Sequence, residues 1–171
     1  MTNRIRAGVL ILALSLTLVA ACGKNESIDQ SVPQPTKAVV KIATAGSLDP
    51  GRLIGGITMT VVLPSGVTIK AIPDTQNPSI LVTDPGMVTA SGVAGAYAAA
   101  FATVDQAGRN VHIQVYNQNG FDIGEFVTLT CDIVPWDPPA VGGFGLDGFT
   151  AKDLNGADIN GLSANLTVKL L

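Results

Sequence analysis

Short stretches in which apolar and polar residues alternate recur along the chain, and this period of two constrains the fold more than any other feature. The clearest is "VHIQVY", in which Val111, Ile113 and Val115 alternate with more polar residues. The same pattern recurs in "ITMTVVL" (57–63) and "EFVTLTCDIV" (125–134). Such alternation is typical of a strand that has one face on a core and the other in water. It predicts antiparallel β-sheets that are buried on one side.

The alternation also assigns individual side chains to the two faces of each strand. We expect an inner set made of Ile57, Met59, Val61, Leu63, Val111, Ile113, Val115, Val127, Leu129, Cys131 and Ile133. We expect an outer set made of Thr58, Thr60, His112, Gln114, Tyr116, Thr128, Thr130 and Asp132. Cys131 is therefore expected to be a small buried hydrophobic residue with an unreactive thiol.

Turn-forming residues separate these stretches, because the chain has 19 glycines and 10 prolines. "VTIKAI" follows the turn Pro64-Ser65-Gly66 as a further strand, and shorter strands are expected at 38–43, 87–90, 149–152 and 166–171. Strands at this spacing are typical of an all-β fold with two packed antiparallel sheets, so we expect a sandwich of about nine strands.

The segment "AGAYAAAFATV", residues 94–104, is ambiguous because its alanines favour a helix by propensity. Its surroundings are β, and we interpret it as a strand. We place Tyr97, Ala99 and Phe101 on a face packed against the neighbouring sheet, with Tyr97 in the core.

The N-terminus has the features of a lipoprotein signal peptide. Two arginines precede fourteen uncharged residues, a run too short for a transmembrane helix. The run ends in Val19-Ala20-Ala21-Cys22, which resembles the lipobox of bacterial lipoproteins. This resemblance implies cleavage after residue 21 and acylation of Cys22, whose two or three chains would anchor the protein to a membrane. Gly23 follows the cysteine where Asp would signal inner-membrane retention, so we expect a cell-envelope protein at the outer membrane.

Three segments follow from this interpretation: the signal peptide at 1–21, the lipidated cysteine and a tether at 22–37, and a β-sandwich domain at 38–171. The tether has no hydrophobic period and would hold the domain on the order of 20 Å from the lipid. Removal of the signal peptide takes two of the ten basic residues and no acidic residue, so the formal charge moves from −3 to −5. We expect no nucleic-acid partner, because binding to nucleic acid requires a clustered basic surface.

The order of the segments resembles a known family. The resemblance rests on "IGGITMTVVLPSGVTIKAI", "GMVTASGVAGAYAAAFATV", "NVHIQVYNQNGFDIGEFVTLTCDIV" and "FTAKDLNGADINGLSANLTV". Together these are similar to the cohesin domain and to the carbohydrate-binding superfamily that shares its jelly-roll sandwich. The resemblance covers 38–171 and implies a binding domain without catalysis, since cohesins dock partner modules through a sheet face. The chain departs from the family in having one such domain and no dockerin.

Two other functions stay open beside a protein partner. The first is polysaccharide binding, in which aromatic rings stack on sugar faces; Trp136, in the loop "PWDPPA", and Tyr116 are the candidate ligand contacts. Trp136 could equally pack beneath its proline-rich loop as part of the core rim. The second is a structural envelope role without a specific ligand.

Residues suited to catalysis or metal binding are scarce. His112 is the single histidine and is expected to face outward, whereas Cys131 is expected to face inward, so no Cys-His pair can form. The acidic residues show no local pairing that suggests a glycosidase. We therefore expect no enzyme activity, cofactor or metal.

The stretch "DLNGADINGLSA" loosely resembles a calcium loop that begins at Asp153. An EF-hand loop needs oxygen ligands at positions 1, 3 and 5, a glycine at position 6 and an acid at position 12. Here those last three positions hold Ala157, Asp158 and Ala164. We therefore interpret Asn155-Gly156 and Asn160-Gly161 as tight turns.

Overall fold

The computed structural model describes residues 33–135, 137 and 139–171. These residues form eleven strands: β1 Lys37–Ala45, β2 Ile54–Val62, β3 Val67–Thr68, β4 Ala71–Pro73, β5 Leu81–Thr83, β6 Val88–Ala90, β7 Ala99–Val104, β8 Asn110–Phe121, β9 Glu125–Ile133, β10 Gly145–Asp153 and β11 Ser163–Leu170. Two three-residue 3-10 turns, η1 Gly92–Ala94 and η2 Val141–Gly143, are the helical elements of the described chain. No helix in these residues is long and apolar enough to cross a membrane.

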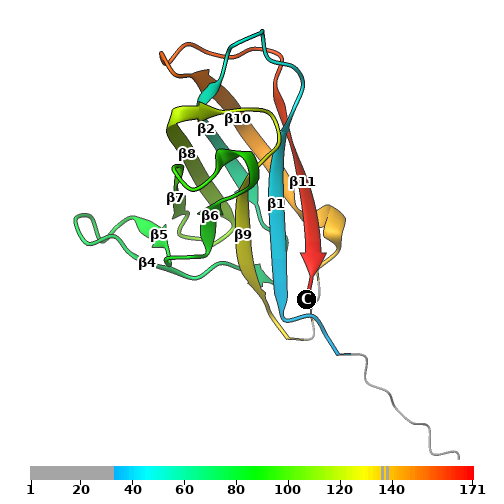
Figure 1. Ribbon diagram of the computed structural model, residues 1–171. Coiled ribbons are helices and arrows are strands. Elements are labelled where there is room, and N and C mark those ends of the chain that lie inside the picture. Colours follow the sequence, from blue (N-terminus) through cyan, green and yellow to red (C-terminus); the bar gives the residue numbers. More distant parts are fainter. Residues whose placement is uncertain (1–32, 136, 138) are drawn as a thin grey trace, which may run out of the picture. The chain divides into compact units, whose positions relative to one another are not determined.

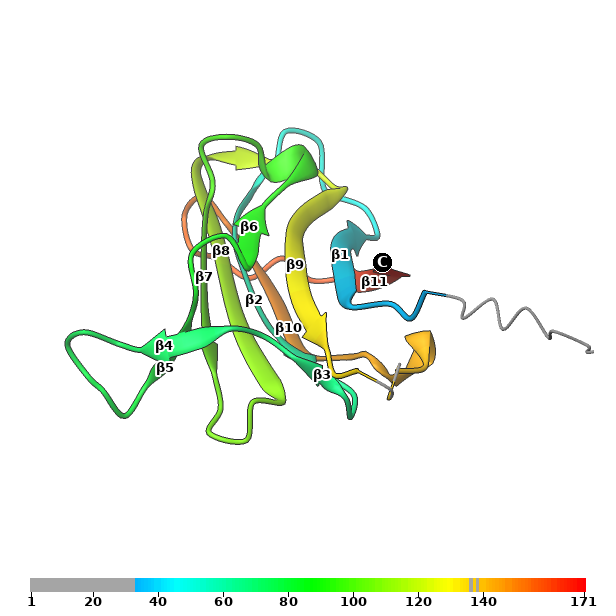
Figure 2. The ribbon, with the colours of Figure 1, turned by 90° about the horizontal axis from the view of Figure 1, so that it is seen from below.

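The strands form two antiparallel sheets, as the alternation predicts. One sheet has the order β11-β1-β9-β3, with β6 also paired to β9; we call it the β1 sheet. The other has the order β10-β2-β8-β7-β5-β4 and is called the β8 sheet. The two sheets pack face to face in a sandwich, and the β4–β5 hairpin projects from one side of it (Figures 1 and 2). The described domain is thus an all-β two-sheet sandwich, with eleven strands where about nine were expected.

The core lies between the sheets and confirms the predicted inner set. Every member of that set is at most 5% exposed, from Val61 and Leu129 at 0% to Ile133 at 5%. Burial of a Val, Leu or Ile side chain contributes about 1.5–3 kcal/mol, so these alternating positions supply much of the driving force for folding.

Phe126 is an additional core residue that alternation alone places on the outside. Ile42 pairs with Val127 and Ala43 pairs with Glu125, so Phe126 is the extra residue of a β-bulge in β9. The bulge turns Phe126 inward beside Val127, where it is fully buried and its ring stacks on that of Phe121. A one-residue insertion in the ladder is not visible as a sequence period.

The stretch 67–72, expected to be one strand, is two strands in different sheets. Val67 and Thr68 pair with β9, whereas Ala71 to Pro73 pair with β5. The chain therefore crosses from the β1 sheet to the β8 sheet at Ile69 and Lys70. The partner of the first part, β9, lies far along the sequence, whereas the partner of the second part, β5, follows it as the other strand of a hairpin. The break therefore depends on these pairings and leaves no signal in the stretch itself.

Only residues 99–104 of the segment 94–104 form a strand, so the prediction is confirmed in part, and the faces of this strand were assigned wrongly. Strand β7 begins at Ala99, and Ala102 and Val104 point into the core, while Tyr97 and Phe101 are 79% and 57% exposed. Phe101 pairs with Gln114, an outward residue of β8, and directly paired residues share a face. Tyr97 precedes the strand in a turn and is not a core residue.

The first strand begins beside the C-terminus of the chain. The backbone N–H groups of Thr36 and Lys37 both donate to the carbonyl of Leu171, at 2.7 and 3.1 Å. Figure 1 shows the C-terminus next to the start of β1. Thr36 and Leu171, which lie near the two ends of the described domain, are therefore side by side.

Candidate functional site

The outward surface of the β8 sheet, formed by β10, β2, β8 and β7, has the features of a binding surface; we call it the outer face. Antiparallel pairing arranges its side chains in rows across the four strands. The rows are Lys152-Gly56-Tyr116-Ala99, Thr150-Thr58-Gln114-Phe101 and Asp147-Thr60-His112-Thr103. The outer positions predicted for His112, Gln114 and Tyr116 are confirmed, since all three are exposed.

Two aromatic side chains dominate the outer face. Phe101 and Tyr116 belong to adjacent rows and neighbouring strands, and their ring centroids lie 5.9 Å apart with 11° between the ring planes. Phe101 is 57% exposed and Tyr116 is 54% exposed. The pair is an exposed apolar patch that the described residues do not cover, and exposed apolar patches can mark binding sites.

Hydroxyl and amide groups surround the aromatic pair. The hydroxyls of Thr58 and Thr150 share a hydrogen bond of 2.6 Å, and Thr60 Oγ1 lies 2.9 Å from His112 Nδ1. These bonds hold the β10, β2 and β8 side chains in a fixed arrangement. The outer face therefore offers an apolar centre with polar groups around it.

A shallow hollow lies next to Tyr116 because Gly56 has no side chain. Its volume is about 150 Å³, and Thr58, Gln114 and Lys152 also line it. A Cβ placed on Gly56 would meet nothing closer than 3.6 Å, and the residue does not have a positive φ. The backbone thus tolerates a side chain at this position, and its absence keeps the surface beside Tyr116 open.

The opposite surface of the sandwich, on the β1 sheet, has a different character. Lys37 pairs with Asp132, and Lys41 Nζ lies 3.0 Å from Glu125 Oε2. The hydrogen bond from Lys41 is the main reason that the pKa of Glu125 is lowered. These two ion pairs satisfy one another's charges, and no exposed aromatic pair like that of the outer face is described on this surface.

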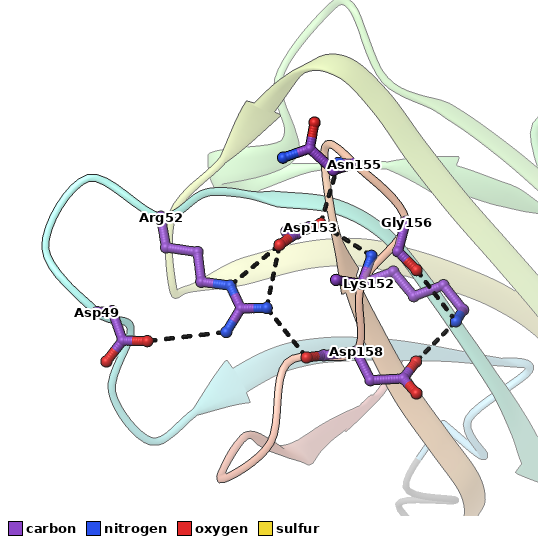
Figure 3. Close-up of polar contacts among 8 residues, drawn as sticks. Asp49, Arg52, Lys152, Asp153, Asn155, Gly156 and Asp158 are labelled. Atoms are coloured by element: carbon purple, nitrogen blue, oxygen red, sulfur yellow. Dashed lines mark hydrogen bonds and ion pairs between the residues drawn. The ribbon is translucent and has the colours of Figure 1, made fainter.

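One end of the β8 sheet carries an ion-pair network, which includes the predicted turns (Figure 3). Arg52 Nη2 lies 3.0 Å from Asp153 Oδ2 and donates to the carbonyl of Asp158, while Lys152 Nζ lies 2.7 Å from Asp158 Oδ1. Asp49 contacts Arg52 from the other side at 3.7 Å. The network ties the loop between β1 and β2 to the turn after β10.

Asp153 serves as the centre of that turn. Its Oδ1 accepts hydrogen bonds from the backbone N–H groups of Ala157 and Asn155, at 2.9 and 3.0 Å. The hydrogen bond from Ala157 is the largest cause of a lowered pKa of Asp153. The bond from Asn155 and the neighbouring Arg52 lower this pKa further. Gly156 and Gly161 have φ values of 80° and 83°, so both predicted tight turns are confirmed. Within the described residues, no group of three or more His, Cys, Asp or Glu side chains is arranged to hold a metal ion.

Cys131 and His112 lie on different surfaces. Cys131 is 1% exposed between the sheets, and burial raises the pKa of its thiol to about 12. His112 points outward from the other sheet. The pair cannot act as nucleophile and base, because the thiol stays protonated and the imidazole does not reach it.

Of the predicted ligand contacts, Tyr116 lies on the outer face, whereas Trp136 lies outside the described residues, as do Cys22 and the rest of segment 1–32. Phe101 is the residue that sequence reasoning missed at this site. Its pairing with the outward residue Gln114 would have revealed its position. That pairing depends on the register of β7 against β8, which local alternation does not give.

Comparison with known proteins supports the architecture. No protein-family model and no curated protein matches the chain. Among solved structures, a non-cellulosomal cohesin from the hyperthermophilic archaeon Archaeoglobus fulgidus is similar, with a TM-score of 0.50 and 14% sequence identity over 75% of each chain. The described domain therefore has a cohesin-like fold.

Proposed function

We propose that the chain is a lipid-anchored protein of the cell envelope whose cohesin-like domain binds a protein partner, without catalysis, through the outer face. The observation that carries this proposal is the stacked pair of Phe101 and Tyr116, more than half exposed on a sheet surface. Aromatic residues are enriched among the side chains that contribute most to protein–protein binding. The cohesin-like fold supports the same conclusion, since cohesins bind partner modules through a sheet face.

The absence of catalysis in this proposal follows from the chemistry of the described residues. The buried thiol of Cys131, with its pKa raised to about 12, is a poor nucleophile. His112 is held by Thr60 on an open strand surface and has no carboxylate in a described hydrogen bond to orient it. A binding role requires neither group.

The anchoring part of the proposal rests on the sequence. Cys22 at the end of a lipobox would carry the acyl chains, and Gly23 favours the outer membrane. The chain enters the sandwich beside Leu171, at one end of both sheets. The outer face lies on the side of the β8 sheet that is turned away from the β1 sheet (Figures 1 and 2).

Polysaccharide binding is a second candidate, and one observation favours it. The ring of Tyr116 is bordered by the hydroxyls of Thr58 and Thr150 and the amide of Gln114, together with the hollow at Gly56. A sugar ring requires such a combination of an aromatic surface and hydrogen-bonding groups. This candidate uses the same outer face, with a different ligand.

The test is binding of the full-length protein, in detergent, to secreted proteins and to cell-wall polysaccharides of the source organism. Tyr116→Ala and Phe101→Ala should each weaken binding about thirtyfold, the effect of losing about 2 kcal/mol at a central aromatic contact. Gly56→Leu should weaken it by filling the hollow. Lys41→Ala, on the opposite surface, is the matched control and should bind normally. Binding that is insensitive to all three outer-face substitutions would overturn the proposal.

A further inference from the structure

Among residues 33–135, 137 and 139–171, no strand pairs with one edge of β7 over most of its length. Strand β5 pairs with β7 at Thr103 and Val104, and this ladder does not extend to Ala99–Ala102. On its other side, β7 pairs with β8 along all six of its residues. Within the described part of the chain, neither a strand ladder nor a turn or loop hydrogen bond joins a partner to the β5-side edge of Ala100.

The hydrogen-bonding pattern between β7 and β8 shows which backbone N–H and C=O groups point toward the open edge. The N–H of Asp105 donates to the carbonyl of Asn110 at 3.0 Å where β7 and β8 meet. Because the groups of successive residues point to opposite sides of a strand, Thr103, Phe101 and Ala99 bond to β8. The N–H and C=O of Ala100 therefore point away from β8, toward the open edge.

A groove of about 540 Å³ lies along this edge. Its apolar lining residues include Ala100, Ala102, Val82, Val88 and Phe101. The turn from Asp84 to Met87 forms one rim, closed by a 3.1 Å hydrogen bond from Met87 N–H to the Asp84 carbonyl. Gly86, with a φ of 88°, allows that turn.

The edge lacks three of the features that normally protect an exposed strand: a proline, a charged side chain and a bulge. Residues 98–102 contain no proline and no charged side chain, and no bulge interrupts the pairing of β7 with β8. Four of the five are alanines, whose small side chains allow another backbone to approach. An unpaired donor and acceptor beside a groove are the requirements for strand addition.

Charge indicates what kind of segment fits. Asp84 is half-buried on the groove wall, and its carboxylate makes no side-chain hydrogen bond or ion pair with the described residues. Neither Lys nor Arg lines the groove. A cationic side chain would complement this carboxylate. A second copy of the chain would instead bring another Asp84 to the same edge.

We propose that the open edge of β7 binds an extended peptide segment of the partner protein as an added strand. The segment pairs with the N–H and C=O of Ala100, places alternate apolar side chains in the groove and sets a Lys or Arg against Asp84. The inference rests on the proposed function, because Phe101 belongs both to the groove and to the outer face, and it specifies how part of the partner binds.

The first measurement tests the free edge by hydrogen exchange of the full-length protein, followed residue by residue by NMR. The N–H groups of Ala99 and Phe101 should be protected by β8, while that of Ala100 should exchange at least tenfold faster. Equal protection of all three would overturn the proposal, because it would show that the edge is already paired.

The second measurement uses a phage-displayed library of random heptapeptides, selected on the full-length protein. Enriched peptides should carry a Lys or Arg near one end of an alternating apolar segment. Methylation of a peptide N–H that faces Ala100 should weaken binding at least tenfold, whereas methylation of the next N–H should not. Asp84→Asn should weaken binding of the same peptides, and binding should protect the Ala100 N–H.

Ala100→Pro is the decisive variant, because it removes the edge donor while leaving the bonds of β7 to β8 in place. This variant should fold and should no longer bind the selected peptides. Tyr116→Ala, which alters the outer face, is the matched variant for comparison. Peptides that bind Ala100→Pro normally but not Tyr116→Ala would overturn strand addition and leave the proposed function intact. The proposal would also be overturned if no peptide were enriched on wild type relative to Ala100→Pro. It would likewise be overturned if the edge bound only a second copy of the chain. If Ala100→Pro does not fold, the N-methyl comparison on wild type decides.

Discussion

Phe101 and Tyr116 stack across neighbouring strands, with ring centroids 5.9 Å apart, although each ring remains more than half exposed. Aromatic pairs contribute about 0.5–1.5 kcal/mol beyond their buried area. A double-mutant cycle of Phe101→Leu and Tyr116→Leu, measured by urea unfolding, should give a coupling energy of about 0.5–1 kcal/mol. Additive effects would show that the rings do not stack in solution.

Cys131 provides a test of the core. Its thiol should resist alkylation in the folded protein at pH 8, because burial keeps it protonated, and Cys131→Ala should lose about 1–2 kcal/mol through a small cavity. Cys131→Asp should be far more destabilising, since it buries an unpaired charge. Mass spectrometry of the peptide that contains Cys131 measures labelling, and denaturant unfolding measures stability.

The thiol also predicts a pH dependence. Its pKa in the folded protein, about 12, exceeds the ordinary value of 9.0, so this contribution to stability is fully present below pH 9 and is lost as the pH rises toward 12. Relative to Cys131→Ala, the wild type should lose stability over that range. Rapid labelling of the thiol at pH 8 would place it on the surface. So would a stability difference between wild type and Cys131→Ala that does not decrease above pH 9.

The strands that the sequence predicts well are those whose two faces differ in polarity. Val111, Ile113 and Val115 alternate with His112, Gln114 and Tyr116, and β8 places both sets as expected. Strand β7 differs because alanine fits either face, so its local sequence does not choose between them. Pairing with β8 makes that choice and turns Phe101 outward.

Sequence reasoning failed elsewhere for a related reason. The bulge that buries Phe126 depends on a mismatch between β9 and β1, which are more than eighty residues apart. The transfer of the chain between sheets at Ile69 depends on β9 and β5. The candidate site was therefore predicted in part: Tyr116 follows from alternation, but its stacking partner follows from a register between two strands.

Asp153 predicts how the protein responds to acid. Because the pKa of Asp153 is lowered in the folded protein, its contribution is present above the ordinary value of 3.8 and is lost as the pH falls below it. Asp153→Asn and Arg52→Ala should both be less stable than wild type at pH 7, and these differences should shrink below pH 3.8. Thermal unfolding across pH measures them. Differences that stay constant with pH would show that the charge of Asp153 does not contribute.

Cys22 tests the anchor. Cys22→Ser removes the thiol that would receive the lipid, so the variant should lack the lipid label and remain unprocessed by the lipoprotein peptidase. Metabolic labelling with a fatty acid, followed by membrane fractionation, measures this outcome. Cys131→Ser, which leaves the lipobox unchanged, is the control and should be labelled normally. A labelled, membrane-bound Cys22→Ser protein would contradict lipid attachment at this residue.

Site-specific photo-crosslinking tests the central claim, that the outer face binds a partner. A photoreactive amino acid at Gln114, which pairs with Phe101 and lies two residues before Tyr116 on the same face, is on the outer face, and the same group at Thr130 lies on the opposite surface. With the full-length protein in its native envelope, Gln114 should give a discrete crosslinked protein that disappears when Tyr116→Ala is added, and Thr130 should give none. The same crosslink from Thr130, or a crosslink from Gln114 that Tyr116→Ala does not affect, would contradict the outer face as the binding surface.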